Sequence, residues 1–177
     1  MNDQELIDRI SILEREVTRL RDLEAIRQLK CEHGLGSDDP ENISERLLAL
    51  VTDDVELDYG EEFGSFTGKS TLRELLKDTP FSWTTHYMIP MQLQLSSDGL
   101  SASGIWYLWE PTTVAKAEGK EEAMWLAAVY EDDYQKQDDG SWKIAKMKLA
   151  TRMLCPYSQG WSPTRITPLE RQWAEDA

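Results

Sequence analysis

The first thirty residues carry apolar side chains at the spacing of one helix face. These positions step by three or four residues, as an amphipathic α-helix requires: Leu6, Ile10, Leu13, Val17, Leu20, Leu23, Ile26 and Leu29. We predict one long helix that His33 closes, followed by helix-breaking residues from Gly34 to Pro40. The first half follows a heptad seam of fewer than three repeats, so it is either a short coiled coil or, more commonly, a helix packed on its own domain or on a neighbour.

Two shorter helices and one strand are predicted next. Asn42 or Ser44 can cap a helix that runs to residue 50, and residues 55–59 alternate between apolar and polar as a strand does. Residues 60–68 are rich in turn formers, and residues 70–76 form a third helix with its first residue, Ser70, as the cap.

After residue 81 the pattern changes from helical to alternating. Long strands are predicted at residues 83–95, 100–113, 123–137 and 141–154, with Gly-containing hairpin turns before the second and the last. Pro90 indicates a bulge or a sheet edge. Helices followed by a strand meander indicate an α+β domain, with three N-terminal helices on one face of a curved antiparallel sheet.

This order divides the chain into three segments. Residues 1–20 are an N-terminal helical extension with the heptad seam, residues 21–155 are the α+β domain, and residues 156–177 are a Pro- and Trp-containing tail. The tail is too apolar for a disordered segment and too often interrupted for a regular element. We expect it to pack on its own or on a neighbouring subunit, with a mobile lid as the alternative.

Composition excludes several classes of function. The chain has 33 acidic and 19 basic residues, a net charge of −14, and no Lys/Arg cluster, which argues against nucleic acid and anionic membranes as partners. It has no apolar run of about 20 residues and no leader pattern, so we expect a soluble cytoplasmic protein. Cys31 and Cys155 lack metal-ligand spacing, and the common nucleotide and zinc motifs are missing, so we expect no metal and no cofactor.

The two histidines, His33 and His86, are the strongest candidates for chemistry. His86 lies in an alternating strand pattern, where its side chain would face a core or a cavity, and Asp38 follows the helix that His33 closes. Imidazole titrates near neutral pH, and a carboxylate beside it fixes its tautomer and raises its basicity. A strand imidazole beside a helix-end carboxylate would form an acid–base site.

Four stretches resemble the SnoaL-like branch of the nuclear transport factor 2-like superfamily, which has a cone-shaped, cystatin-like fold. They span most of the predicted domain and occur in the family's order: residues 22–30 (DLEAIRQLK), 104–108 (GIWYL), 130–134 (YEDDY) and 139–144 (DGSWKI). Among its members, the chain is most similar to the bile acid 7α-dehydratase and more distantly similar to lindane dehydrochlorinase and scytalone dehydratase. Such proteins often associate through the open sheet face, which implies a homo-oligomer, a dimer or a trimer.

The resemblance also implies roles for individual residues. Asp38 and His86 fall where the first two of these enzymes pair an Asp with a strand His, and Tyr59 falls at an active-site Tyr of the bile acid enzyme. Arg152 lies one residue out of step with an Arg of the last strand. The chain departs from the bile acid enzyme at two positions, where His33 stands for a catalytic Tyr and Glu110 for an Asp.

We therefore predict a cofactor-free lyase, a dehydratase or a related isomerase, acting on a hydrophobic hydroxy-ketone such as a steroid or polyketide. His86 is the expected base and Asp38 its partner, and Tyr59 or His33 donates to the oxyanion or the leaving group. Arg152 is the weakest of the catalytic candidates. Residues expected to contact the substrate are Trp83, Met88, Trp106, Leu108 and Glu110. The alternative is a non-catalytic protein of the same fold that binds a small apolar ligand or serves in assembly.

Overall fold

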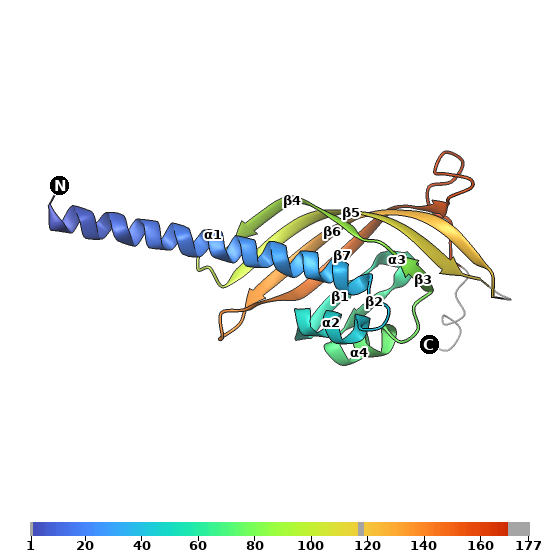
Figure 1. Ribbon diagram of the computed structural model, residues 1–177, viewed down its shortest axis with the longest axis horizontal. Coiled ribbons are helices and arrows are strands. Elements are labelled where there is room, and N and C mark those ends of the chain that lie inside the picture. Colours follow the sequence, from blue (N-terminus) through green and yellow to red (C-terminus); the bar gives the residue numbers. More distant parts are fainter. Residues whose placement is uncertain (1, 117–118, 170–177) are drawn as a thin grey trace.

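The long helix α1 (Asp3–Ser37) extends far beyond the rest of the protein at its N-terminal end (Figure 1). The computed structural model describes residues 2–116 and 119–169. A capping box starts the helix, because the Asn2 side chain accepts from the Glu5 amide and the Glu5 carboxylate accepts from the Asn2 amide, both at 2.9 Å. The single long helix is confirmed, but it continues past His33 to Ser37.

Two glycines lie inside the last turns of α1 instead of ending it. A Cβ atom on Gly34 would stand 3.3 Å from the Met88 side chain and 3.5 Å from the Cβ of His86. A Cβ atom on Gly36 would stand 3.1 Å from the side chain of Leu47. The prediction that these glycines break the helix is wrong, because their function is to let other elements approach its backbone closely.

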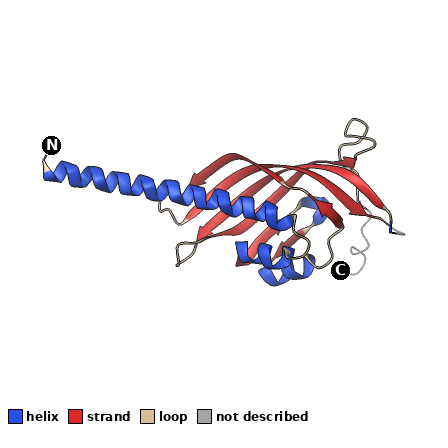
Figure 2. Cartoon of the chain, viewed as in Figure 1, coloured by secondary structure: helices blue, strands red, loops and turns tan. Residues whose placement is uncertain are grey.

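The elements after α1 form a small helical layer and one seven-stranded sheet (Figure 2). They are α2 (Ile43–Leu50), β1 (Val51–Asp58), α3 (Gly60–Phe63), β2 (Ser65–Thr67), α4 (Lys69–Leu75), β3 (Phe81–Thr84), β4 (Tyr87–Leu95), β5 (Ser101–Ala115), β6 (Glu121–Lys136) and β7 (Trp142–Pro156). The sheet order is β2-β1-β7-β6-β5-β3, and β4 also pairs with β5. The α+β class is thus confirmed.

The sheet is mixed and not purely antiparallel as predicted. Strand β1 pairs in parallel with β7, whereas the other strand pairs are antiparallel. A parallel neighbour needs a long crossover, and here the crossover contains the helices α3 and α4 and the hairpin strands. The alternation of apolar and polar residues does not reveal the relative direction of two strands, because it is the same in parallel and antiparallel pairs.

Capping and turn predictions differ from the structure in detail. Asn42 stands at the N-cap of α2, yet its side chain makes no capping hydrogen bond and donates to the carboxylate of Asp39. Helix α4 begins after Gly68, so Ser70 lies inside the helix and is not its cap. The stretch predicted as turns contains the single-turn helix α3 and the short strand β2.

The strand predicted over residues 83–95 is interrupted at the position of His86. Strand β3 ends at Thr84, β4 begins at Tyr87, and both pair with β5. His86 is therefore not a strand residue, because its backbone N–H donates to the carboxylate of Asp38 at 2.9 Å. Pro90 was predicted to mark a bulge or a sheet edge, and the bulge is confirmed by a register shift between Pro90 and Gln92.

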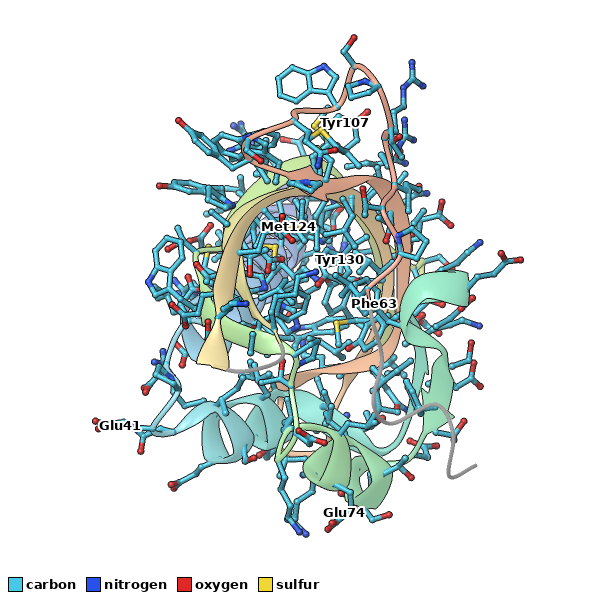
Figure 3. The ribbon with its side chains drawn as sticks, turned by 90° about the vertical axis from the view of Figure 1, so that its right-hand side faces the viewer. Glu41, Phe63, Glu74, Tyr107, Met124 and Tyr130 are labelled. Carbon is cyan, nitrogen blue, oxygen red and sulfur yellow. The ribbon has the colours of Figure 1, made fainter. Side chains whose placement is uncertain are left out.

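The sheet curls around an interior that the helices cover from one side. In Figure 3 the labelled side chains of Tyr130 and Met124 lie inside this curl, whereas Tyr107 lies outside it. The described part of the tail adds to the edge of the fold, since Ile166 forms a parallel bridge with Leu154 of the same chain. The rest of the tail prediction concerns residues 170–177, including Trp173, which lie outside the described residues.

Candidate active site

A cavity of about 970 Å³ opens between the curled sheet and the short helices. Its wall combines apolar side chains with a few polar ones, as small-molecule sites commonly do. The polar groups come from separate elements: His33 at the end of α1, Asp38 after it, Tyr59 after β1, His86 between β3 and β4, and Glu110 on β5. The apolar part includes Leu72, Phe81, Leu126 and Leu149. The fold therefore brings distant parts of the sequence to one wall.

His86 and Asp38 are in direct contact at this wall. The Nδ1 atom of His86 lies 2.6 Å from Oδ1 of Asp38, and the His86 side chain is only 10 % exposed. Because the carboxylate accepts from Nδ1–H, it holds the neutral ring in the tautomer whose Nε2 carries the lone pair. With Asp38 bound at Nδ1, the atom of His86 that can accept a proton is Nε2, on the other side of the ring.

Asp38 is held by three donors. Its carboxylate accepts from the His86 ring, from the His86 backbone N–H at 2.9 Å and from the hydroxyl of Thr84 at 2.9 Å. Burial alone would raise the pKa of Asp38, but the hydrogen bonds from His86 and Thr84 outweigh it and lower that pKa below its ordinary value. The carboxylate therefore stays ionised and orients the imidazole.

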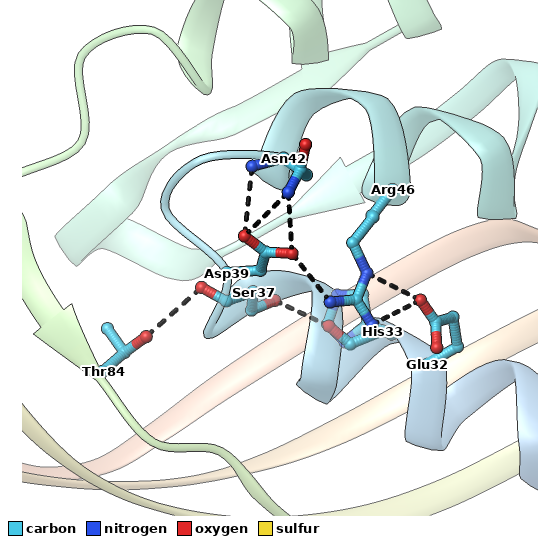
Figure 4. Close-up of polar contacts among 7 residues, drawn as sticks. All are labelled: Glu32, His33, Ser37, Asp39, Asn42, Arg46 and Thr84. Atoms are coloured by element: carbon cyan, nitrogen blue, oxygen red, sulfur yellow. Dashed lines mark hydrogen bonds and ion pairs between the residues drawn. The ribbon is translucent and has the colours of Figure 1, made fainter.

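The turn that carries Asp38 is fixed by its neighbours (Figure 4). The Ser37 hydroxyl donates to the His33 carbonyl at 2.8 Å, and the Thr84 hydroxyl also lies 3.3 Å from the Ser37 carbonyl. Arg46 of α2 pairs with Glu32 at 2.6 Å and with Asp39 at 3.0 Å. These contacts tie the end of α1 to α2 and to the His86 segment.

Glu110 lies on the opposite side of the His86 ring from Asp38. Its Oε2 atom is 3.3 Å from Nε2 of His86, and the Glu110 side chain is 5 % exposed. Burial raises the pKa of Glu110 to about 7, with the nearby Asp38 charge adding to the rise and His86 opposing it. Near neutral pH this carboxyl can both hold and release a proton, so His86 stands between an ionised carboxylate and a titrating one.

His33 and Tyr59 contribute neutral polar groups to the same cavity. Burial strongly lowers the pKa of His33, and the charges of Lys30 and His86 lower it further, so its ring is uncharged. Among the described residues its Nδ1 atom has no hydrogen-bond partner. Burial raises the pKa of Tyr59 well above its ordinary value, so its phenol remains a donor. Tyr59 and the His33 ring both line the cavity, but the unpaired Nδ1 atom of His33 is buried.

The other predicted substrate contacts are divided between the cavity, the core and the surface. Trp83 lines the cavity with part of a side chain that is 56 % exposed overall. Trp106 and Leu108 share the inward face of β5 with Glu110 but are buried in the core, where Trp106 donates to the Tyr134 hydroxyl at 2.8 Å. Met88 packs partly buried against the same core. Trp106, Leu108 and Met88 lie outside the cavity lining.

Arg152 lies on the outside of the sheet and not in the cavity wall, so its predicted position in the site is wrong. The β6–β7 register shifts beside it, with Ala127 opposite Met153 and Ala128 opposite Thr151, which leaves Arg152 without a partner in the ladder. Its side chain is exposed. The bulge explains the difference, because one extra residue reverses the direction in which side chains point.

Sequence reasoning missed two residues of the site. Tyr130 lines the cavity, and its ring lies edge-on to His33 with 5.7 Å between the ring centroids. Thr84 was an unremarkable strand residue until the structure placed its hydroxyl on Asp38. For Tyr130 a signal was present, since it shares the inward face of β6 with Leu126 and Ala128.

Metal-binding and membrane-spanning features are not found in the described part of the chain. No group of three or more His, Cys, Asp or Glu side chains is arranged to hold a metal ion there. Within the same residues, no helix is both long and apolar enough to span a bilayer.

The fold and the sequence have clear relatives. The structure of LinA, the lindane dehydrochlorinase, is 24% identical over 87% of this chain and 99% of its own, with a TM-score of 0.70. A scytalone dehydratase-like protein from Novosphingobium aromaticivorans is also 24% identical over 88% and 98% of the two chains, with a TM-score of 0.69. ActVI-ORFA from Streptomyces coelicolor is 15% identical over 72% and 95%, with a TM-score of 0.56. No curated protein sequence matches significantly.

The family assignment rests on the sequence as well as on the fold. The profile of the SnoaL-like domain matches residues 18–148, which is most of the chain and nearly all of the predicted domain. LinA and scytalone dehydratase are lyases, so the fold's relatives include dehydratases and dehydrochlorinases. The chain belongs to the SnoaL-like family of the nuclear transport factor 2-like superfamily.

Proposed function

We propose that the protein is a cofactor-free lyase that eliminates water from a hydrophobic hydroxy-ketone of steroid or polyketide type. The observation that carries this proposal is the placement of His86 between Asp38 and Glu110 on the wall of a large, mainly apolar cavity. Such a site offers a base, a group that titrates near neutral pH, and room for a polycyclic or aromatic ligand. The lyases among the structural neighbours support the reaction class.

His86 and Glu110 can divide the proton transfers of this reaction. The Nε2 atom of His86 takes the proton from the carbon next to the carbonyl, while the protonated Glu110 carboxyl gives its proton to the leaving hydroxyl. A C–H and a C–O bond break, a C=C bond forms, and water leaves. The 3.3 Å contact between the two groups then lets the His86 proton pass to Glu110, which restores the starting state.

In the proposed reaction, Tyr59 and His33 stabilise the enolate. The Tyr59 phenol stays protonated because burial raises its pKa, so it can donate to the developing oxyanion. The neutral His33 ring lines the cavity and binds the same oxygen or the leaving group through a ring nitrogen that carries the proton. Asp38 stays charged and stabilises the protonated His86 ring that forms during the reaction.

Removing the base tests the proposal directly. Hydroxy-ketones of steroid and polyketide type are incubated with the unchanged protein, with His86→Ala and with His86→Asn, whose amide can still donate to Asp38. We expect turnover to fall by about 10² to 10⁴ in both variants. Tyr87→Phe is the matched control, because Tyr87 is 54 % exposed on the neighbouring strand and should keep full activity. Equal turnover by the unchanged protein and both His86 variants would remove His86 as the base.

The same assay separates catalysis from ligand binding alone. Mass spectrometry of the reaction mixture measures the product. Loss of water in a lyase reaction of this type gives a product about 18 Da lighter than the substrate. A substrate that binds and is recovered unaltered from the unchanged protein, across the whole set, would instead support a binding protein of the same fold.

A further inference from the structure

The projecting half of α1 exposes a continuous apolar seam. Figure 1 shows this part of the helix extending away from the sheet and the other helices. The seam residues are between 44 and 62 % exposed and follow the heptad spacing: Leu6, Ile10, Leu13, Val17 and Leu20. A helix of this kind is stabilised mainly by packing of its apolar face, so its exposure in a single chain indicates a missing partner.

The residue types along the seam favour a particular partner. If Leu6 is assigned to heptad position d, then Ile10 and Val17 occupy a, and Leu13 and Leu20 occupy d. Branched Ile and Val at a with Leu at d is the combination that favours parallel two-stranded coiled coils. The seam therefore fits a second copy of the same helix.

The charged residues beside the seam match a second copy in the same direction. In a parallel pair, each g residue faces the e residue of the next heptad on the partner helix. This register brings Arg9 to Glu14 of the second copy, and Glu16 to Arg21 of the second copy. Both contacts, and their symmetric equivalents, join opposite charges. In an antiparallel pair, Arg9 would instead face Glu16 of the second copy. Arg21 would then face none of these charged residues.

The position of the seam also leaves room for two domains. The residues by which α1 packs on its own domain begin at Asp22 and Leu23 and continue through Ile26, Lys30 and His33. At about 100° per residue, this packed face and the seam point roughly 150° apart around the helix axis. Two parallel helices would then carry their domains on opposite outer sides. The seam positions that follow are polar, Glu24 and Arg27, and end the apolar stretch.

We propose that residues 6–20 of two copies form a parallel, in-register coiled coil that joins their two α+β domains. The inference does not depend on the proposed reaction, because the seam lies on a different part of the protein from the cavity. With just over two heptads, the contact is short, so its occupancy depends on protein concentration.

Charges placed in the seam test the interface. Sedimentation of the full chain, at a concentration on the order of 100 μM so that a short coiled coil is populated, is compared with that of Ile10→Lys/Val17→Lys, which we expect to halve the particle mass. The matched control is Ile12→Lys/Thr18→Lys, which adds the same charges outside the seam and should leave the mass unchanged. An identical mass for the seam variant and the unchanged protein, or an equal loss in the control, would overturn the proposal. The substituted residues lie on the projecting helix, so the domain itself should fold normally.

A charge exchange tests the direction of the helices. Glu16→Arg should weaken association, because it places a second positive charge beside Arg21 of the other copy. Adding Arg21→Glu in the same chain should restore association in a parallel pair, since the arginine introduced at position 16 then meets the glutamate introduced at position 21. In an antiparallel pair position 16 faces Arg9, so the second change would not help. Failure of the double variant to regain the original mass would exclude the parallel arrangement.

Discussion

Two charge clusters lie beside α1, and they differ in whether the large cavity of about 970 Å³ adjoins them. In the core, Lys30 pairs with Asp132 at 2.8 Å, with both side chains 0 % exposed. At the cavity wall, His86 pairs with Asp38 and Glu110. The core pair lies outside the cavity lining, whereas all three residues of the second cluster belong to it. Burial and ion pairing alone are therefore weak indicators of function, and contact with the large, mainly apolar cavity is the feature that separates the two clusters.

In the core pair, Lys30 and Tyr134 both contact Oδ2 of Asp132, whereas its buried Oδ1 has no hydrogen-bond partner among the described residues. The Tyr134 hydroxyl donates to Asp132 at 2.8 Å and accepts from Trp106, and the Lys30 ammonium lies 3.6 Å from the centroid of the Tyr130 ring. Burial lowers the pKa of Lys30, while the charge of Asp132 opposes the shift. This cluster holds α1 against β6, and neither charged residue borders the cavity through which a substrate would enter.

The largest effect on stability is expected from breaking the core pair. Asp132→Ala would leave Lys30 buried without its partner, and we expect the free energy of unfolding to fall by about 3–5 kcal/mol. Urea unfolding of the variant and the unchanged protein measures this loss of free energy. Asp133→Ala, at the exposed neighbouring position of β6, is the control and should change stability by less than about 0.5 kcal/mol. Similar losses in the two variants would show that the core pair has no special structural role.

Glu110 should make stability depend on pH in the opposite sense to an ordinary ion-paired carboxylate. Its pKa in the folded protein is about 7, above the ordinary 4.5, so the folded state favours the protonated form. Its contribution to stability is complete below about pH 4.5 and is lost as the pH rises through about 7. Relative to Glu110→Gln, the unchanged protein should lose about 3 kcal/mol of unfolding free energy over this range. Urea unfolding at several pH values tests it, and parallel stability curves for the two proteins would contradict it.

The smallest effect is expected from the Tyr59 hydroxyl. Tyr59→Phe removes one hydrogen-bond donor to the developing oxyanion, and a lost hydrogen bond to a charged group corresponds to about a 10- to 100-fold loss of turnover. Turnover of the best substrate measures it. The matched control is Tyr107→Phe, since Tyr107 is 43 % exposed and lies outside the curl of the sheet in Figure 3. If the two variants have the same activity, Tyr59 does not bind the reacting oxygen.

The candidate site was partly predictable, and the reasons differ among its residues. Asp38 and His86 were paired through the resemblance to known enzymes, since nothing in the alternation of residues 83–95 indicates a partner 48 residues earlier. The same alternation wrongly placed His86 inside a strand. Glu110 was expected on the inward face of β5, but its contact with Nε2 of His86 depends on how two strand segments meet β5. Arg152 was misplaced because the resemblance put it one residue out of step with an Arg of the last strand, at a point where the structure has a β-bulge.

The sequence by itself determined the elements whose signals are local. The apolar spacing specified α1 as one long helix with an apolar seam, and alternation with Gly-containing turns specified the long strands β5, β6 and β7. Periodicity suffices there because each residue's environment repeats along the element.

Tertiary structure alone decided the features that depend on two distant segments meeting. These are the passage of α1 through Gly34 and Gly36, the parallel pairing of β1 with β7, the break in the edge strand at His86, and the cavity beside it. In each case the backbone follows a long-range contact in place of its local preference, as when the His86 amide donates to Asp38 and not to β5. The proposed chemistry of the site depends on this contact, because it brings the His86 segment to the Asp38 carboxylate.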